Sequence, residues 1–321
     1  MTRSNRHVLI GSAPAIQRVR ALIERIAPTP LPVLIHGETG TGKEIVAASI
    51  HAASTRSGPL VALNASAIPE SMFESTLFGH VRGAFTGATG SAAGYLAEAH
   101  RGTLFLDEIS SMALPAQAKL LRAIETRSFR PVGASEDRRS DFRVVAATNE
   151  DLDGLVETGR FRRDLLERLR GVRLHVPPLR ARREDIPALT AHFLAGVAPG
   201  STGTATIDPA AMELLIAHDW PGNVRELRRA VECAAAMADG GCIGVADVAP
   251  QLSTPLSAGG VFSVQGHERH HLLTILRLNG GDVDAAASTL GVHRATIYRW
   301  IKRLELDGVV RPAEGRSALL A

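Results

Sequence analysis

The chain has 321 residues, of which 45% are hydrophobic and 21% charged, values that exclude a disordered or collagen-like chain. Its 36 Lys and Arg against 33 Asp and Glu leave a net charge of +3, too small by itself to indicate nucleic-acid binding. The two cysteines, Cys233 and Cys242, are too few for a disulfide scaffold and lack the Cys-x-x-Cys spacing of a zinc site, which fits a reducing cytoplasm. The length predicts about two domains, with room for a small third module.

The N-terminal residues lack the apolar core of a signal peptide. The longest uncharged stretch, residues 186–207, is interrupted by prolines and glycines and falls short of the roughly 20 apolar residues that cross a bilayer. We therefore expect a soluble cytoplasmic protein with no membrane span.

Short β-rich runs lie in the first two thirds of the chain, separated by helical patterns such as residues 116–124. Several of them are continuously apolar, which is typical of strands buried on both faces. Strands that alternate with helices predict a parallel α/β sheet. The runs cover residues 31–36, 61–64, 103–107, 142–148 and 172–176.

The pattern changes after Pro177 and Pro178, because residues 184–239 read as helices only. A later stretch rich in Ser, Gly and Pro carries no charge and predicts a flexible linker. Three short helical patterns then occupy residues 267–304. The predicted parts are an α/β subdomain (1–178), a helical subdomain (179–252), a linker (253–266), a small helical domain (267–311) and a tail (312–321).

A glycine-rich segment follows the first strand and opens a helical run, the context that a phosphate-binding P-loop requires. The segment consists of Gly37, Glu38, Thr39, Gly40, Thr41, Gly42 and Lys43. Its backbone N–H groups and the helix N-terminus attract an anion, and Lys43 reaches the β- and γ-phosphates. Glu44 stands where Ser or Thr usually offers a hydroxyl to magnesium. The alternative is a plain glycine-rich turn, which the flanking strand and helix make the weaker interpretation.

The apolar run at 103–107 ends in two carboxylates, Asp107 and Glu108. A carboxylate at a strand end beside a P-loop is the expected Mg²⁺ ligand, so we assign Asp107 to the metal and Glu108 to the attacking water. Alone, the run could be a solvated strand end; the P-loop favours the nucleotide site. Another strand ends in Thr148 and Asn149, whose amide is placed to sense the γ-phosphate, although such an Asn is usually a turn residue.

Residues 77–88 read LFGHVRGAFTGA, in which Gly83 and Gly87 bracket a short segment containing Phe85. An apolar ring on a glycine-hinged segment is either buried or kept for a partner. Because most Phe side chains are buried, the residues alone favour burial.

Seven motifs occur in order: GETGTGKE, LFGHVRGAFTGA, GTLFLDEI, AATN, GRFRRDLLERL, VPPLRARREDI and WPGNVRELRRA. Together they resemble the central domain of the sigma-54-dependent transcription activators, bacterial enhancer-binding proteins of the AAA+ ATPase class. The resemblance covers roughly residues 8–250, with a further match over 267–304, and GAFTGA (83–88) is its most specific part. It implies an α/β fold, namely a P-loop AAA+ parallel sheet flanked by helices, a helical lid and a C-terminal Fis-type helix-turn-helix.

The resemblance implies a role for each matching residue in the nucleotide site. Lys43 would bind phosphate, and Glu44 is the residue that the family itself carries after this lysine. Asp107 and Glu108 resemble the pair that holds magnesium and activates water. Asn64 would hold Glu108 in check until the partner is engaged. The two sensors of the nucleotide would be Asn149 and Arg225.

Other roles implied by the resemblance involve partners. Arg162 and Arg168 match arginine fingers that reach a neighbouring subunit's nucleotide, although the residues alone do not separate them from solvated arginines nearby. A trans arginine contributes about 10³–10⁵ in rate, so hydrolysis should depend on ring assembly. The sigma factor would be contacted by Gly83, Ala84, Phe85, Thr86, Gly87 and Ala88.

Residues 267–304 have the short turns of a helix-turn-helix. The donors of the last helix that suit phosphates and major-groove bases are Arg294, Thr296, Tyr298, Arg299 and Lys302. Residues 267–311 carry seven Lys or Arg against five Asp or Glu, so the pattern and not the charge supports DNA binding. The alternative is a basic surface helix of an interaction domain.

The sequence therefore predicts an ATP- and Mg²⁺-dependent transcription activator that binds enhancer DNA and remodels the closed complex of sigma-54 RNA polymerase by ATP hydrolysis. It would assemble as a homo-oligomer, from dimer to hexameric ring. Because about seven residues precede the ATPase motifs, we expect the receiverless type, as in the phage-shock-protein activator, with a separate regulatory protein. The alternatives are an ATP-binding, DNA-binding regulator that does not act on sigma-54 and an AAA+ remodeller of another substrate, such as a chelatase or helicase loader.

Overall fold

The computed structural model describes residues 9–197, 206–238 and 241–252, together with Val283 and Ile297. The chain divides into two compact units, Met1–Leu252 and Ser253–Ala321, and every element named below lies in the first. Within the described residues, no helix is both long enough and apolar enough to cross a bilayer.

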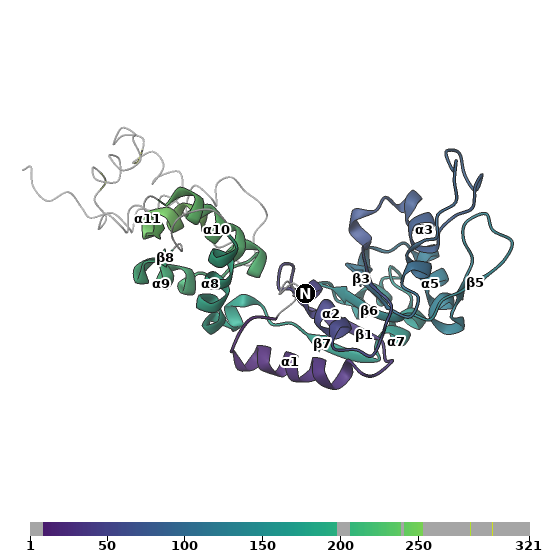
Figure 1. The fold of residues 1–321 in the computed structure, drawn as a ribbon, viewed down its shortest axis with the longest axis horizontal. Helices are drawn as coiled ribbons and strands as arrows, with labels where there is room; N and C mark the ends of the chain where they lie inside the picture. The colour runs from purple at the N-terminus through teal and green to yellow at the C-terminus, as the bar shows by residue number, and fades with distance from the viewer. Residues whose placement is uncertain (1–8, 198–205, 239–240, 253–282, 284–296, 298–321) are drawn as a thin grey trace, which may run out of the picture. The chain divides into compact units, whose positions relative to one another are not determined.

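Five parallel strands form the central sheet in the order β2-β3-β6-β1-β7 (Figure 1). Each of the five β-rich runs supplies one of these strands, which confirms the predicted parallel α/β fold. Of the three interior strands, β3 and β6 are almost wholly buried, as continuously apolar runs predict. The strands are β1 (Val33–His36), β2 (Leu60–Asn64), β3 (Thr103–Asp107), β6 (Arg143–Thr148) and β7 (Val172–His175).

Helices cover both faces of this sheet. Along β3, Leu104 and Leu106 join the core on one face and Phe105 joins the core on the other, because successive side chains of a strand alternate. One face is covered by α1 (Pro14–Ile26) and α2 (Lys43–Ala52). The other is covered by α3 (Glu70–Phe78), α4 (Tyr95–Glu98), α5 (Leu114–Thr126), α6 (Leu152–Glu157) and α7 (Arg163–Leu169).

The strand register brings the polar strand ends to one edge of the sheet. Asn64 at the end of β2 is paired with Asp107 at the end of β3. Thr148 at the end of β6 is paired with His36, the residue before the P-loop. This edge, at the carboxyl ends of parallel strands, is where such sheets bind ligands.

The helical subdomain packs around a core that includes the buried Trp220 and Leu227. The prediction that residues 184–239 are helices only is wrong at one point, because β8 (Thr206–Ile207) pairs with β9 (Cys242–Ile243). Two-residue strands are too short for a hydrophobic period to reveal them. The helices are α8 (Ile186–Val197), α9 (Pro209–Ala217), α10 (Asn223–Met237) and α11 (Val245–Val248).

Short elements complete the described part of the chain. A small antiparallel pair, β4 (Ser128–Phe129) and β5 (Arg138–Arg139), lies outside the main sheet. Single turns of 3-10 helix link the larger elements, and two of them lead from the sheet into the helical subdomain. They are η1 (Ala65–Ala67), η2 (Ile109–Ser111), η3 (Leu179–Ala181), η4 (Arg183–Asp185) and η6 (Ala249–Gln251).

Candidate active site

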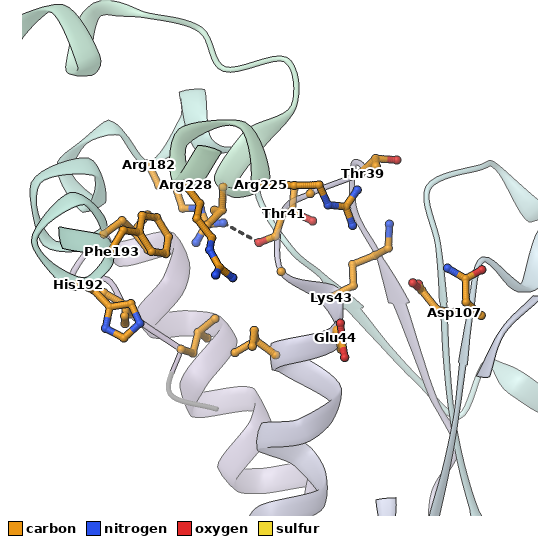
Figure 2. Close-up of a pocket in the computed structure, with 18 of the residues that line it drawn as sticks. Thr39, Thr41, Lys43, Glu44, Asp107, Arg182, His192, Phe193, Arg225 and Arg228 are labelled. Atoms are coloured by element: carbon orange, nitrogen blue, oxygen red, sulfur yellow. Dashed lines mark hydrogen bonds between the residues drawn. The ribbon is translucent and has the colours of Figure 1, made fainter. Parts of the chain in front are cut away.

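The P-loop between β1 and α2 borders a cavity of about 510 Å³. The ends of β2 and β3 line the cavity together with residues of α8 and α10. Lys43 and Arg225 point into the same space, and Asp107 faces Lys43 from β3 (Figure 2). His192 and Phe193 lie at the far end of the cavity. The cavity therefore has a charged end at the P-loop and a more apolar end that a nucleotide base could fill.

Lys43 is buried at the first turn of α2 and is held by two contacts. Its ammonium group donates to the carbonyl of Gly37 at 3.0 Å and lies 3.5 Å from Oε1 of Glu108. The first contact spans the P-loop, and the second joins the loop to the end of β3. Lys43 and Glu108, which lie 65 positions apart in the sequence, thus meet as the motifs predict.

Asp107 has a buried carboxylate oxygen, Oδ1, with no hydrogen-bond partner among the described residues. Burial raises the pKa of Asp107, while the positive charge of Lys43 acts in the opposite direction. Mg²⁺ prefers oxygen ligands and usually binds through one or two carboxylates together with phosphates. An unpartnered carboxylate oxygen beside a phosphate-binding loop fits that ion.

Glu108 has a backbone φ of +51°, in the left-handed region that few residues other than Gly adopt. Such backbone conformations concentrate at functional sites, where the surrounding fold enforces them. The turn follows β3 directly and brings Glu108 into the cavity lining beside Asp107.

The two polar residues predicted to sense or restrain the site have different contacts. Nδ2 of Asn149 donates to the Thr39 hydroxyl at 3.2 Å, so the predicted first sensor contacts the P-loop. Asn64 lines the same cavity as Glu108, but its side chain accepts from the amide and hydroxyl of Ser66 at 2.9 and 2.7 Å. The restraint of Glu108 by Asn64 therefore stays a prediction.

Arg182 is a cavity residue that the sequence interpretation missed. It is buried, and its guanidinium donates to the carbonyl of Thr41 at 2.9 Å. Burial lowers the pKa of Arg182. The charged run of VPPLRARREDI resembles a solvated surface, so nothing local marks this one arginine as buried. Arg228 was also missed; it lies on α10 one turn beyond Arg225 and lines the cavity with it.

The predicted arginine fingers do not line this cavity. Arg162 is the N-cap residue of α7, and its guanidinium binds both carboxylate oxygens of Asp164, at 3.1 and 2.8 Å. Arg168 lies in the last turn of α7. Both arginines lie outside the cavity of their own subunit, which is compatible with the predicted contact to a neighbouring subunit's nucleotide. That contact stays a prediction.

The 83–88 loop is closed by backbone hydrogen bonds and presents its aromatic ring to solvent. The amide of Gly83 donates to Ala88 O at 2.9 Å, and the φ values of Gly83 and Gly87, +80° and +101°, require glycine-like freedom. Phe85 is 46% exposed and contacts the His80 ring edge-on, with centroids 5.1 Å apart. The burial that composition favours for Phe85 is therefore wrong, because a glycine-hinged loop lifts the ring away from the core.

Comparison with known families agrees with these arrangements. A family model described as the sigma-54 interaction domain matches residues 9–175, more than half of the chain. The chain belongs to the sigma-54 interaction domain family. Two further models match later parts of the chain, an AAA+ ATPase lid domain over residues 180–259 and a winged helix-turn helix over residues 271–320.

Curated relatives of this sigma-54 interaction domain protein are transcriptional regulators. It is 44% identical over 301 residues to the transcriptional regulatory protein ZraR of Escherichia coli, an alignment that covers 92% of this chain and 68% of ZraR. It is 39% identical to the Nif-specific regulatory protein of Azotobacter vinelandii, over 94% of this chain and 59% of that protein. The crystal structure of NtrX from Brucella abortus in complex with ATP matches with a TM-score of 0.72 and 34% identity, covering 94% of this chain and 70% of NtrX.

These matches confirm the predicted family, the AAA+ sheet with its lid, and the presence of a C-terminal helix-turn-helix. The matching model is of the winged type, and the Fis-type assignment stays a prediction. The receiverless type also stays a prediction. The proposed DNA contacts lie outside the described residues: Arg294, Thr296, Tyr298, Arg299 and Lys302.

Proposed function

We propose that this protein is an ATP-hydrolysing transcription activator that acts on sigma-54 RNA polymerase. The observation that carries the proposal is one AAA+ domain with two features. Lys43, Asp107 and Glu108 converge on one cavity, and Phe85 is exposed on the GAFTGA loop. The complex of NtrX with ATP supports a nucleotide as the occupant of this cavity.

Each site residue would have a separate role in ATP hydrolysis. Lys43 would contact the β- and γ-phosphates, and Asn149 and Arg225 would contact the γ-phosphate from β6 and α10. Glu108 would orient a water molecule and take its proton as the water oxygen bonds to the γ-phosphorus; the bond to the bridging oxygen breaks, releasing ADP and phosphate. Asp107 would hold Mg²⁺, which when bound offsets the charge on the phosphate oxygens.

Hydrolysis would require a ring. Arg162 and Arg168 of one subunit would reach the nucleotide held by the next, and the loss of the γ-phosphate would change the contacts at this junction. A ligand biases a protein between two conformations only through contacts that differ between them. Such a difference would move the 83–88 loop against the sigma factor, while the helix-turn-helix holds the assembly on enhancer DNA.

Two substitutions test the hydrolysis site. Lys43→Ala should lose ATP binding, because the ammonium group at the phosphate position is removed. Glu108→Ala should bind ATP with unchanged affinity and hydrolyse it at least about 100-fold more slowly, since general base catalysis contributes about 10²–10⁴ in rate. Fluorescent-ATP titration and phosphate release measure the two steps, and full turnover by Glu108→Ala would overturn the assignment.

A third substitution tests the loop. Thr86→Ala should keep ATP hydrolysis and DNA binding but fail to capture sigma-54 in the presence of ADP and a metal fluoride that mimics the transferring phosphoryl group. If this variant captures sigma-54 as the unsubstituted protein does, the loop assignment is wrong. If the unsubstituted protein hydrolyses ATP and never captures sigma-54, the alternative of a regulator that does not act on sigma-54 replaces the proposal.

A further inference from the structure

Glu38 belongs to the P-loop motif, but its side chain lies elsewhere than the motif predicts. It does not line the nucleotide cavity, unlike Thr39, Gly40 and Thr41, which follow it. Its two carboxylate oxygens accept from the two terminal nitrogens of Arg180, one of them at 2.8 Å. Arg180 belongs to η3, at the start of the helical subdomain, so the P-loop carboxylate is paired with a residue 142 positions away.

Asn223 reinforces this contact from the start of α10. Its Nδ2 donates to Oε2 of Glu38 and to the carbonyl of Thr39, both at 3.1 Å, and its Oδ1 accepts from the amide of Leu179 at 2.8 Å. The side chain is fully buried, and its φ of +54° lies in the left-handed region. A buried amide in this uncommon conformation, with both its polar atoms engaged, indicates a position built for these contacts.

Backbone carbonyl groups of the P-loop also accept hydrogen bonds from the helical subdomain and from the segment that leads into it. The amide of Arg225 donates to the carbonyl of Gly40 at 3.3 Å, and Arg182 donates to that of Thr41. Gly40 has a φ of +79°, and a Cβ atom added there would lie 2.2 Å from the carbonyl oxygen of Gly222. Only glycine therefore permits so close an approach between the P-loop and the turn that precedes α10.

We propose that Glu38, Arg180 and Asn223 form a clamp that fixes the P-loop to the helical subdomain, and that Glu38 supports nucleotide binding as a positioning residue and not as a phosphate ligand. This inference rests on the nucleotide site proposed above. A free carboxylate beside triphosphate would repel it. Paired with Arg180, the Glu38 charge is neutralised while the loop that faces the phosphates is held in place.

The direction in which Glu38→Gln changes the affinity for ATP distinguishes the clamp from a purely electrostatic effect. Glu38→Gln removes a negative charge near the phosphate site, and charge alone would then tighten ATP binding. Loss of the clamp would weaken binding, because the loop would have to be ordered when the nucleotide binds. Arg180→Gln is expected to weaken binding by either mechanism, so Glu38→Gln is the decisive variant.

The experiment titrates a fluorescent ATP analogue into the full chain and into Glu38→Gln, Arg180→Gln and the double variant. We expect each single variant to bind about 3- to 10-fold more weakly, since the pair is partly solvent-exposed. The double variant should bind no more weakly than either single one, because all three lose the same interaction. Hydrogen exchange of residues 37–43 without nucleotide should be faster in all three variants.

Arg183→Gln is the matched control. Arg183 follows closely in the chain and pairs with Asp219, which lies outside the P-loop. We expect its ATP affinity and P-loop exchange to be unchanged. The clamp is overturned if Glu38→Gln binds as tightly as the unsubstituted protein or more tightly, if the single effects add in the double variant, or if Arg183→Gln weakens binding equally. Failure of the unsubstituted protein to bind the analogue at all would instead overturn the proposed function, and the clamp with it.

Discussion

At the scale of single residues, the buried ionised carboxylate of Asp107 lowers the stability of the fold, while the proposed chemistry uses the same carboxylate to hold Mg²⁺. Its raised pKa means that folding disfavours the ionised carboxylate, so stability falls as pH rises from the unfolded-state pKa through the folded-state pKa of this group, and it stays lower above that range. Asp107→Asn should therefore be more stable than the unsubstituted protein by about 1 kcal/mol at neutral pH, with the difference shrinking in acid. Its Mg²⁺-dependent ATP hydrolysis should fall at least about 100-fold.

Thermal unfolding between pH 4 and pH 8, run without nucleotide, measures the stability difference, and phosphate release measures the activity. Asn keeps the size of the side chain, so a loss of folding is not expected. A variant with normal hydrolysis would remove Asp107 from the metal site. A variant that is less stable at neutral pH would contradict the inferred cost of the buried charge.

The sequence was sufficient to predict those site residues that lie at the end of a strand or shortly after it. Lys43, Asp107 and Asn149 each follow an apolar run, and parallel strands bring such ends to one edge. Arg182 and the partners of Glu38 were not predictable in the same way. Their contacts join residues more than a hundred positions apart, and an arginine in a charged run carries no local sign of burial.

At the scale of elements, the 83–88 loop is where composition and structure disagree. Phe85 is 46% exposed, whereas Phe78 at the end of α3 is buried. Phe85→Ala should therefore change the free energy of unfolding by less than about 0.5 kcal/mol, while Phe78→Ala should lose about 3–5 kcal/mol. Urea unfolding of both variants measures this contrast.

Phe85→Ala should nevertheless lose the capture of sigma-54, since the ring is the loop's only large apolar side chain. A strongly destabilised Phe85→Ala would mean that the ring supports the fold and is not reserved for a partner.

Helices and long strands were predictable because they repeat a hydrophobic period. The loop's exposure was indicated only by the family resemblance, and the pair of β8 and β9 was too short to have any period.

At the scale of the whole molecule, we propose that the site is complete only in a ring of subunits. The nucleotide residues line one cavity, but Arg162 and Arg168 lie outside it. Arg162→Ala and Glu108→Ala should each hydrolyse ATP slowly when alone. Mixed together, they should recover part of the activity, because a Glu108→Ala subunit supplies its Arg162 to a neighbour that still has Glu108.

Phosphate release from mixtures at constant total protein tests this complementation, and the mixture of Glu108→Ala with Lys43→Ala, in which no subunit has both Lys43 and Glu108, should show no recovery. Arg162→Ala with normal activity alone would exclude a role in hydrolysis. Mixtures without recovery would contradict a site shared between subunits. The division into a sheet subdomain and a helical subdomain could be predicted from the change to helical patterns after Pro178, whereas the proposed sharing of a site between copies rests on the family's arginine motif alone.

In the proposed mechanism, ATP hydrolysis by this protein drives the opening of promoter DNA by sigma-54 RNA polymerase. The most direct measurement is promoter melting, followed by permanganate reactivity of unpaired thymines, with purified sigma-54 polymerase, this protein and ATP. We predict melting with ATP and none with a non-hydrolysable analogue or with Thr86→Ala. Melting that proceeds without hydrolysis, or ATP hydrolysis that never produces melting, would contradict the account.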